Sequence, residues 1–183
     1  MEPVRLPTRF VQPDVVVEHF HIRPGDVVAD IGSGSGFFLP ALAAAVADEG
    51  RVYACEIQKS LVEKIGDHVR AANWTQVSPV WGDVEALGGI KVPDGSVDIV
   101  VLVNTLFLLA DKATAVSEID RILRPGGKVC VVDWTESFQG MGPQDDMVIS
   151  QSAATDLFES HSFQLETVYD AGEHHYGLAF RKS

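Results

Sequence analysis

Residues 30–36 combine residue types that could bind a charged ligand. Asp30 ends an apolar run, and glycines at positions 32, 34 and 36 then lead into a stretch rich in alanine and leucine. Glycines without side chains let a backbone approach a ligand closely. This pattern is typical of a loop that holds a nucleotide-type cofactor where a first β-strand gives way to a helix.

The spacing within this loop discriminates between cofactors. A dinucleotide-binding loop needs a glycine at its sixth position, and counting from Gly32 that position is Phe37. The carboxylate of Asp30 would repel a pyrophosphate but attract a cation. S-adenosylmethionine carries an ammonium and a sulfonium group and no phosphate, so it fits better than NAD. A nicotinamide oxidoreductase is therefore the disfavoured alternative.

The overall charge argues against a nucleic-acid substrate. The 183 residues include 14 Lys and Arg against 26 Asp and Glu, which gives a formal net charge of −12. Phosphate binding draws on clustered basic residues, and no such cluster is visible in the sequence. The length and ordinary composition predict a single domain over residues 1–183, with an N-terminal arm and helix over 1–23.

The two cysteines predict a reducing environment. Cys55 and Cys130 both fall in apolar, strand-like runs, where free thiols are buried. No signal peptide, membrane-spanning run or lipidation motif is visible. The sequence thus predicts a cytoplasmic protein without a membrane span.

The order of elements predicts an α/β fold. Apolar runs of strand length alternate with helical patterns, which indicates a parallel sheet covered by helices on both faces. Pro79 interrupts one strand and favours its placement at a sheet edge. The last two strands are joined only by residues 170–172, so they must form an antiparallel hairpin. The expected strands are 26–31, 51–56, 76–80, 97–103, 128–133, 163–169 and 176–181. The expected helices begin near 13, cover 36–47, 111–123 and 147–160, and include one in which Leu61, Ile65 and Val69 recur at four-residue spacing.

Five sequence blocks, in this order along the chain, carry a family resemblance. They are the segments 29–36 (ADIGSGSG), 53–56 (YACE), 82–84 (GDV), 97–100 (VDIV) and 123–127 (LRPGG). On these blocks the chain resembles class I S-adenosylmethionine-dependent methyltransferases, and is most similar to the ubiquinone/menaquinone C-methyltransferase-like (type 11) branch. The resemblance covers residues 24–182. It implies a Rossmann-like doubly wound sheet of seven strands, of order 3-2-1-4-5-7-6, with only strand 7 antiparallel.

The resemblance also implies a cofactor site at the strand ends. The amino-acid end of the cofactor would lie along the glycine loop, with its carboxylate near backbone N–H groups and its ammonium near Asp30. The two ribose hydroxyls would bind Glu56, and the adenine would meet Asp83. The full set of implied cofactor-binding residues is Asp30, Gly32, Ser33, Gly34, Gly36, Glu56, Ile57, Gly82, Asp83, Val84 and Asn104.

Each acidic residue has a simpler reading when it is taken alone. Asp30 or Asp83 could cap a helix or a turn, and Glu56 could be a solvated surface charge. Together, however, the three follow neighbouring strands, and open α/β sheets bind ligands at the carboxyl ends of their strands. Their convergence favours the cofactor site.

Methyl transfer makes modest chemical demands on a protein. The acceptor and the methyl group must be aligned for an in-line (SN2) displacement and shielded from water, and a base is needed only when the acceptor must lose a proton. Asn104 would face the sulfonium, and His174 is the candidate proton acceptor, with a solvated turn histidine as the alternative. His174 and His175 would point to opposite faces of a strand, so no metal site is expected.

The sequence leaves the acceptor open. No Asn-Pro-Pro-Tyr block follows the fourth strand, which disfavours amino methylation of adenine or glutamine. The N-terminal arm, with Phe10, is expected to fold over the cofactor. With only this arm and the short loop after the fifth strand as cover, the site is expected to be open. An open site suits a protein side chain, or a small molecule enclosed by a second subunit in a homodimer. Besides the methyltransferase, which would yield S-adenosylhomocysteine, the alternative is a catalytically silent subunit that keeps the fold to bind a partner.

Overall fold

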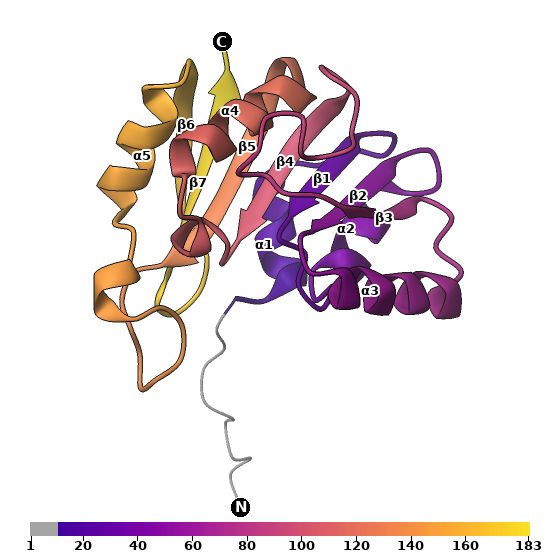
Figure 1. Ribbon diagram of the computed structural model, residues 1–183, viewed down its shortest axis with the longest axis horizontal. Coiled ribbons are helices and arrows are strands. Elements are labelled where there is room, and N and C mark those ends of the chain that lie inside the picture. The colour runs from indigo at the N-terminus through magenta and orange to yellow at the C-terminus, as the bar shows by residue number, and fades with distance from the viewer. Residues whose placement is uncertain (1–10) are drawn as a thin grey trace, which may run out of the picture.

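A seven-stranded sheet of order β3-β2-β1-β4-β5-β7-β6 forms the centre of the computed structural model, which describes residues 11–183 (Figure 1). Strands β1 to β5 are parallel, whereas β7 pairs antiparallel with both β5 and β6. The predicted strand order and the closing hairpin are therefore confirmed. The strands are β1 (Val27–Ile31), β2 (Arg51–Glu56), β3 (Val77–Trp81), β4 (Val97–Val103), β5 (Leu123–Trp134), β6 (Phe163–Asp170) and β7 (His175–Lys182).

Helices cover both faces of this sheet. The helices α1 (Pro13–Phe20), α2 (Leu39–Val46) and α3 (Lys59–Ala72) contribute to one apolar layer, and α4 (Lys112–Ile122) and α5 (Gln151–Glu159) contribute to the other. Because both faces are covered, the central strand β4 is an almost continuous apolar run. Across residues 11–183 no helix has the length and apolar character needed to cross a membrane.

The edges of the sheet follow from the residues present. Pro79 lies in β3, which pairs only with β2 and so forms one edge, as predicted. At the opposite edge residues 171–174 connect β6 to the antiparallel β7. Cys55 and Cys130 are buried free thiols within β2 and β5, also as predicted.

Two helices begin later than predicted. The helix expected from residue 36 begins at Leu39, because Gly36 has a φ of +83°, outside the helical region. Phe37 consequently precedes the helix and is 65% exposed. The helix expected from residue 147 begins at Gln151, where the Ser150 hydroxyl accepts the N–H of Ala153 at 3.1 Å and caps it.

The connection between β3 and β4 has an unusual form. Parallel strands are usually joined through a helix, yet residues 82–96 contain only turns and irregular backbone. Ile90 and Val92 of this segment are buried in the same apolar layer as α4 and α5. The segment therefore packs on the sheet face without helical hydrogen bonds of its own.

Candidate functional site

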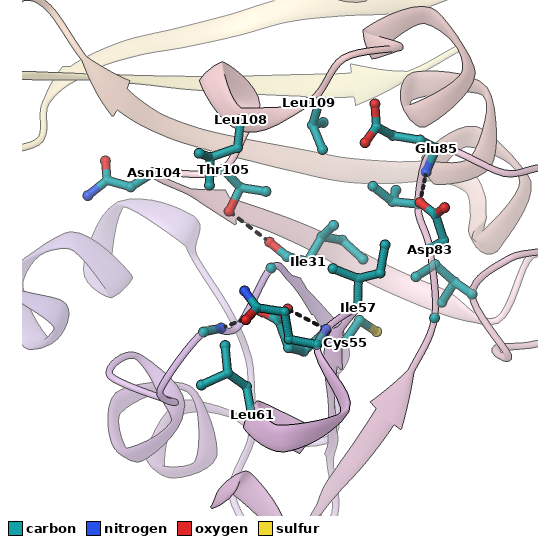
Figure 2. Close-up of a pocket in the computed structure, with 17 residues that line it drawn as sticks. Ile31, Cys55, Ile57, Leu61, Asp83, Glu85, Asn104, Thr105, Leu108 and Leu109 are labelled. Carbon is teal, nitrogen blue, oxygen red and sulfur yellow. Dashed lines mark hydrogen bonds between the residues drawn. The ribbon is translucent and has the colours of Figure 1, made fainter. Parts of the chain in front are cut away.

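The first of two adjoining pockets lies at the carboxyl ends of β1, β2, β3 and β4. It has a volume of about 410 Å³, and Figure 2 shows Asn104 and Asp83 at its opposite ends. Eight of the predicted site residues line it: Gly32, Gly34, Glu56, Ile57, Gly82, Asp83, Val84 and Asn104.

The second pocket continues from the first around the glycine loop. It has a volume of about 280 Å³ and shares Gly32, Gly34 and Asn104 with the first pocket. Asp30 and Ser33 line only this second pocket. Val11 also lines it; Phe10 and the remainder of the predicted arm lie outside the described residues. Gly36 lines neither of the two pockets.

The glycine loop requires glycine for two different reasons. Gly32 and Gly34 have φ values of +75° and +57°, which favour glycine. At Gly32 there is also no room, because a Cβ atom would lie 2.6 Å from Oγ1 of Thr105, whereas at Gly34 the nearest atom would be 3.9 Å away. Gly32 and Ser33 donate their N–H groups to the carbonyl of Cys55 at 2.9 and 3.1 Å, which fixes the loop against β2.

The carboxylate of Glu56 is held on both sides. Its Oε2 accepts the N–H of Gly34 at 3.0 Å, and its Oε1 accepts the N–H of Gln58 at 2.9 Å. Glu56 is buried yet lines the first pocket. The simpler reading of this residue as a solvated surface charge is therefore wrong.

Asp30 is a buried carboxylate next to the second pocket. Only 3% of it is exposed, and its Oδ2 accepts the Ser33 hydroxyl at 2.5 Å. Burial raises its pKa from the ordinary 3.8 to about 6, the Ser33 hydrogen bond opposes that rise, and the charge of Glu56 adds to it. Asp30 is thus largely ionised at neutral pH and suited to attract a cation.

Asp83 lies two residues after the end of β3, at the start of a tight turn. Its Oδ1 accepts the N–H of Glu85 at 2.8 Å, so the turn role considered from the sequence is present together with the pocket position. Gly82 must lack a side chain, because a Cβ there would lie 2.6 Å from the carbonyl oxygen of Gly89. The floor of the pocket at this end therefore depends on close backbone packing.

Asn104 follows β4 in a left-handed conformation with a φ of +53°. Its N–H donates to the carbonyl of Val132 at 2.8 Å, while its side-chain Oδ1 is buried and has no hydrogen-bond partner. A buried acceptor without a donor is unfavourable. Because Asn104 lines both pockets, this oxygen could accept a hydrogen bond from a bound ligand.

His174 lies at the same edge of the sheet but lines neither pocket. Its Nδ1 is 2.7 Å from Oε1 of Glu136, and its ring stacks on Phe138 with ring centroids 3.9 Å apart. The antiparallel direction of β7 brings His174 to the carboxyl edge, as expected, beside the loop that follows β5. Within residues 11–183 no three His, Cys, Asp or Glu side chains group in a way that could hold a metal ion.

Several lining residues were not anticipated from the sequence. Thr105 holds the loop after β4 to β1, since its hydroxyl donates to the carbonyl of Ile31 at 3.1 Å. The signal for Ile31, Cys55 and Gln58 was their position at or just after a strand end. The residues of the first pocket outside the predicted cofactor-binding set are Ile31, Cys55, Gln58, Leu61, Glu85, Ile90, Thr105, Leu108 and Leu109.

Comparison with curated proteins identifies relatives of part of the chain. The ubiquinone/menaquinone biosynthesis C-methyltransferase UbiE of Hydrogenovibrio crunogenus is 32% identical over 123 residues, which make up 67% of this chain and 48% of that protein. The chain spans between 34% and 48% of the length of the first three curated relatives that it matches.

Comparison with solved structures covers nearly the whole chain. A S-adenosylmethionine-dependent methyltransferase from Aquifex aeolicus has a TM-score of 0.88 at 24% identity, over 100% of this chain and 94% of that chain. The [4+2]-cyclase SpnF has a TM-score of 0.78 at 16% identity, over 93% and 80% of the two chains. At these identities the likeness shows the fold alone, and that fold serves proteins of different named activity.

The match to a protein family completes the assignment. The sequence profile described as "Methyltransferase domain", of type 11, matches residues 29–131, more than half of the chain. These residues include the glycine loop, Glu56, Asp83 and Asn104. The chain therefore belongs to the type 11 branch of the class I S-adenosylmethionine-dependent methyltransferase family.

Proposed function

We propose that this chain binds S-adenosylmethionine across the two pockets and transfers its methyl group to a small molecule or a protein side chain, releasing S-adenosylhomocysteine. One observation carries the proposal. The two pockets meet at Gly32, Gly34 and Asn104, with a buried carboxylate in the second pocket and three carboxylates, those of Glu56, Asp83 and Glu85, along the first. This layout suits a ligand with a cationic amino-acid end and a nucleoside end joined at a central sulfonium.

The first pocket fits the adenosine end. Glu56 offers a carboxylate to the ribose hydroxyls, and Asp83 offers one to the adenine amino group. The apolar side chains of Ile57, Leu61 and Leu109 line the space between them, as suits the flat faces of a base.

The second pocket fits the amino-acid end. The ionised carboxylate of Asp30 would attract the ligand's ammonium. The unpartnered Oδ1 of Asn104 would accept a hydrogen bond from the ligand near the junction of the pockets. A pyrophosphate would meet the same carboxylate unfavourably, which disfavours NAD. Phe37 adds nothing to that argument, because it precedes α2, is 65% exposed and lines the second pocket itself.

When bound, S-adenosylmethionine supplies a methyl group activated by positive sulfur. The protein then has to align the acceptor and exclude water, which alone can provide most of the rate. Where the acceptor must lose a proton, we propose that His174 receives it at a ring nitrogen while Glu136 stabilises the resulting cation.

Calorimetric titration with S-adenosylhomocysteine tests the binding step. We expect binding by the wild type, and a loss of about tenfold in affinity for Asp83→Asn, because the negative charge is lost and one acceptor oxygen becomes an NH2 donor facing the adenine amino group. Asp67→Asn is the matched control, since Asp67 pairs only with Arg70 on the surface of α3 and lies outside both pockets. The absence of wild-type binding at millimolar ligand would refute the proposal.

A transfer assay with a radiolabelled methyl donor tests turnover. Metabolite, protein and RNA fractions of a lysate are compared, and we expect the label in the metabolite or the protein fraction because the chain is strongly acidic. Binding without transfer to any fraction would favour the catalytically silent alternative, and a dominant RNA signal would overturn the expected acceptor class.

A further inference from the structure

Residues 82–96 form one side of the first pocket, yet they lack a helix to satisfy their backbone. Gly82, Asp83, Val84 and Glu85 line the pocket directly, as does Ile90 further along. Buried backbone N–H and carbonyl groups must find partners somewhere. For the described residues of this segment, a large share of those partners comes from one turn of α4.

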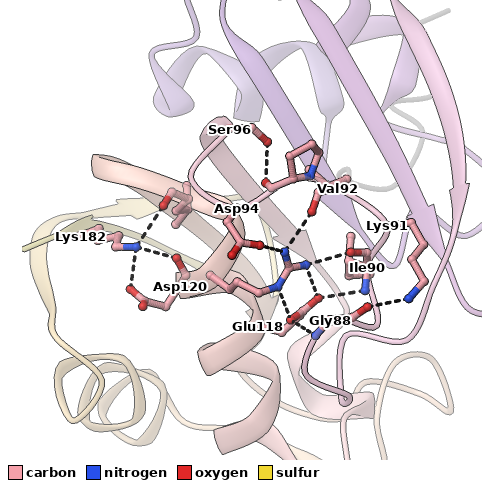
Figure 3. Close-up of polar contacts among 12 residues, drawn as sticks. Gly88, Ile90, Lys91, Val92, Asp94, Ser96, Glu118, Asp120 and Lys182 are labelled. Carbon is pink, nitrogen blue, oxygen red and sulfur yellow. Dashed lines mark hydrogen bonds and ion pairs between the residues drawn. The ribbon is translucent and has the colours of Figure 1, made fainter.

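Glu118 of α4 supplies the acceptors. It is 0% exposed, and its carboxylate accepts the N–H of Gly88 at 2.7 Å and the N–H of Ile90 at 2.9 Å (Figure 3). Burial acts to raise the pKa of Glu118, but the hydrogen bonds from Arg121, Ile90 and Gly88, with the charge of Arg121, lower it overall. Glu118 is therefore an ionised carboxylate, and each of its oxygens accepts one hydrogen bond from this segment and one from Arg121.

Arg121, one turn further along α4, supplies the donors. Its guanidinium bonds Glu118 at 2.7 Å and donates to the carbonyls of Ile90 at 2.9 Å and Val92 at 3.1 Å, and it also pairs with Asp94. The planar fork of arginine carries five N–H donors spread over three nitrogens, so it reaches acceptors that lie too far apart for the single ammonium of lysine. The two residues together hold backbone groups from Gly88 to Val92.

The backbone held by Glu118 and Arg121 packs closely against the backbone of Gly82 and Asp83 in the first pocket. A Cβ at Gly89 would lie 2.0 Å from the carbonyl oxygen of Asp83, and one at Gly82 would lie 2.6 Å from the carbonyl oxygen of Gly89. With no side chain between them, the 88–90 backbone rests directly on the 82–83 backbone. Any shift of Gly88 or Ile90 therefore moves Asp83.

We propose that Glu118 and Arg121, which line neither pocket, are positioning residues that set the affinity of the first pocket for the adenosine end of the ligand. The proposal rests on the proposed function above. The carboxyl group of Asp83 is useful only at a fixed distance from the adenine amino group, and these two α4 residues fix it.

Equilibrium binding to Glu118→Gln tests the proposal. The amide cannot accept at both of its ends and removes the charge that Arg121 faces, so the 88–92 backbone should loosen. We expect the affinity for both S-adenosylhomocysteine and adenosine to fall by about tenfold, within the range by which remote substitutions alter binding. Asp30→Asn should weaken S-adenosylhomocysteine alone, because Asp30 lies in the second pocket.

The matched control is Glu166→Gln. Glu166 also forms an ion pair with an arginine, Arg181 at 2.9 Å, but it lies on the edge strand β6, away from both pockets. We expect its affinities to equal those of the wild type. General destabilisation lowers the fraction of binding-competent protein, not the affinity of the folded fraction, so calorimetry below the unfolding transition separates the two effects.

Arg121→Lys keeps the test decisive if Glu118→Gln does not fold. Lysine retains the charge but cannot reach Ile90, Val92 and Glu118 together, so affinity should again fall, and amide exchange over residues 82–95 should accelerate. Affinities within twofold of the wild type for the folded variants would overturn the positioning role and leave the proposed function intact. If the wild type itself bound no S-adenosylhomocysteine, both proposals would fail.

Discussion

At the scale of single residues, Asp30 is where pH should act on ligand binding. Its pKa is raised to about 6 by burial, so it is mostly charged at pH 7 and mostly neutral at pH 5. An ammonium ligand favours the charged form and remains protonated over this range. We expect the affinity for S-adenosylhomocysteine to fall about tenfold from pH 7 to pH 5. Calorimetric titration between pH 5 and pH 7 measures this affinity. The Asp30→Asn variant should bind S-adenosylhomocysteine more weakly at pH 7, and its affinity should not change with pH. An unchanged slope in that variant would contradict the assignment.

The two glycines of the loop provide a second residue-scale prediction. Gly32→Ala should destabilise the fold by roughly 2–4 kcal/mol, because it combines a positive φ with a clash against Thr105. Gly34→Ala serves as the control, with a similar φ but open space around its Cβ, and should lose only about 1 kcal/mol. Urea denaturation measures both free energies of unfolding. Equal losses would mean that the approach of Thr105 contributes nothing.

At the scale of elements, α5 depends on one aromatic contact set. Phe158 is fully buried and packs against Phe180 and Phe163 of the β6–β7 hairpin, with ring centroids 4.7 and 5.7 Å apart. Phe158→Ala should lower the free energy of unfolding by about 3–5 kcal/mol through loss of burial and a residual cavity.

Phe37→Ala is the control for that substitution. This substitution removes a side chain of the same size, but one that is 65% exposed. The free energy of unfolding should therefore fall by less than about 0.5 kcal/mol. A comparable loss for the two variants would show that burial of the α5 face does not govern its attachment.

The elements themselves were largely predictable from hydrophobic pattern. The Arg51–Glu56 and Val97–Val103 strands matched their predictions because nearly continuous apolar runs between turns leave little choice of boundary. The predicted start of α2 was wrong because Gly36, which the sequence pattern places in the helix, adopts a positive φ in the folded chain. Tertiary packing, which the local pattern does not record, made that choice.

The site was predictable where it follows strand ends, and not elsewhere. Glu56, Asp83 and Asn104 line the first pocket because the chain leaves parallel strands at a common edge. Glu118 and Arg121 were missed, although a charged residue among the buried positions Ala115, Ile119 and Ile122 was a visible signal. That the partner of Glu118 and Arg121 is the segment 82–96 could be known only from the fold.

At the scale of the whole molecule, two buried carboxyls should shape the dependence of stability on pH. Burial raises the pKa of both Asp30 and Asp133 to about 6, above the values near 4 expected in the unfolded chain. The folded state therefore binds more protons between those values, and the ligand-free protein loses stability as pH rises from about 4.5 to 6. The loss should be on the order of 2 kcal/mol for each group.

Urea denaturation across that pH range checks this expectation. The double variant Asp30→Asn/Asp133→Asn should show a flatter profile than the wild type, while the exposed pair Asp67→Asn/Asp145→Asn should keep the wild-type slope. A steep decline persisting in the first double variant would mean that other groups govern the dependence.

The two backbone hydrogen bonds to Glu56 have a consequence for the entropy of binding. A glutamate side chain can lose about 1.5–2 kcal/mol of rotameric freedom when it is fixed, and here the N–H groups of Gly34 and Gln58 fix it in the absence of any ligand. That freedom is lost on folding and not on binding, so the end of the first pocket that we propose for the ribose is preorganised. Ligand affinity at that end is consequently tied to the order of the glycine loop and of the start of α3, and a substitution that loosens either will weaken binding without touching the ligand.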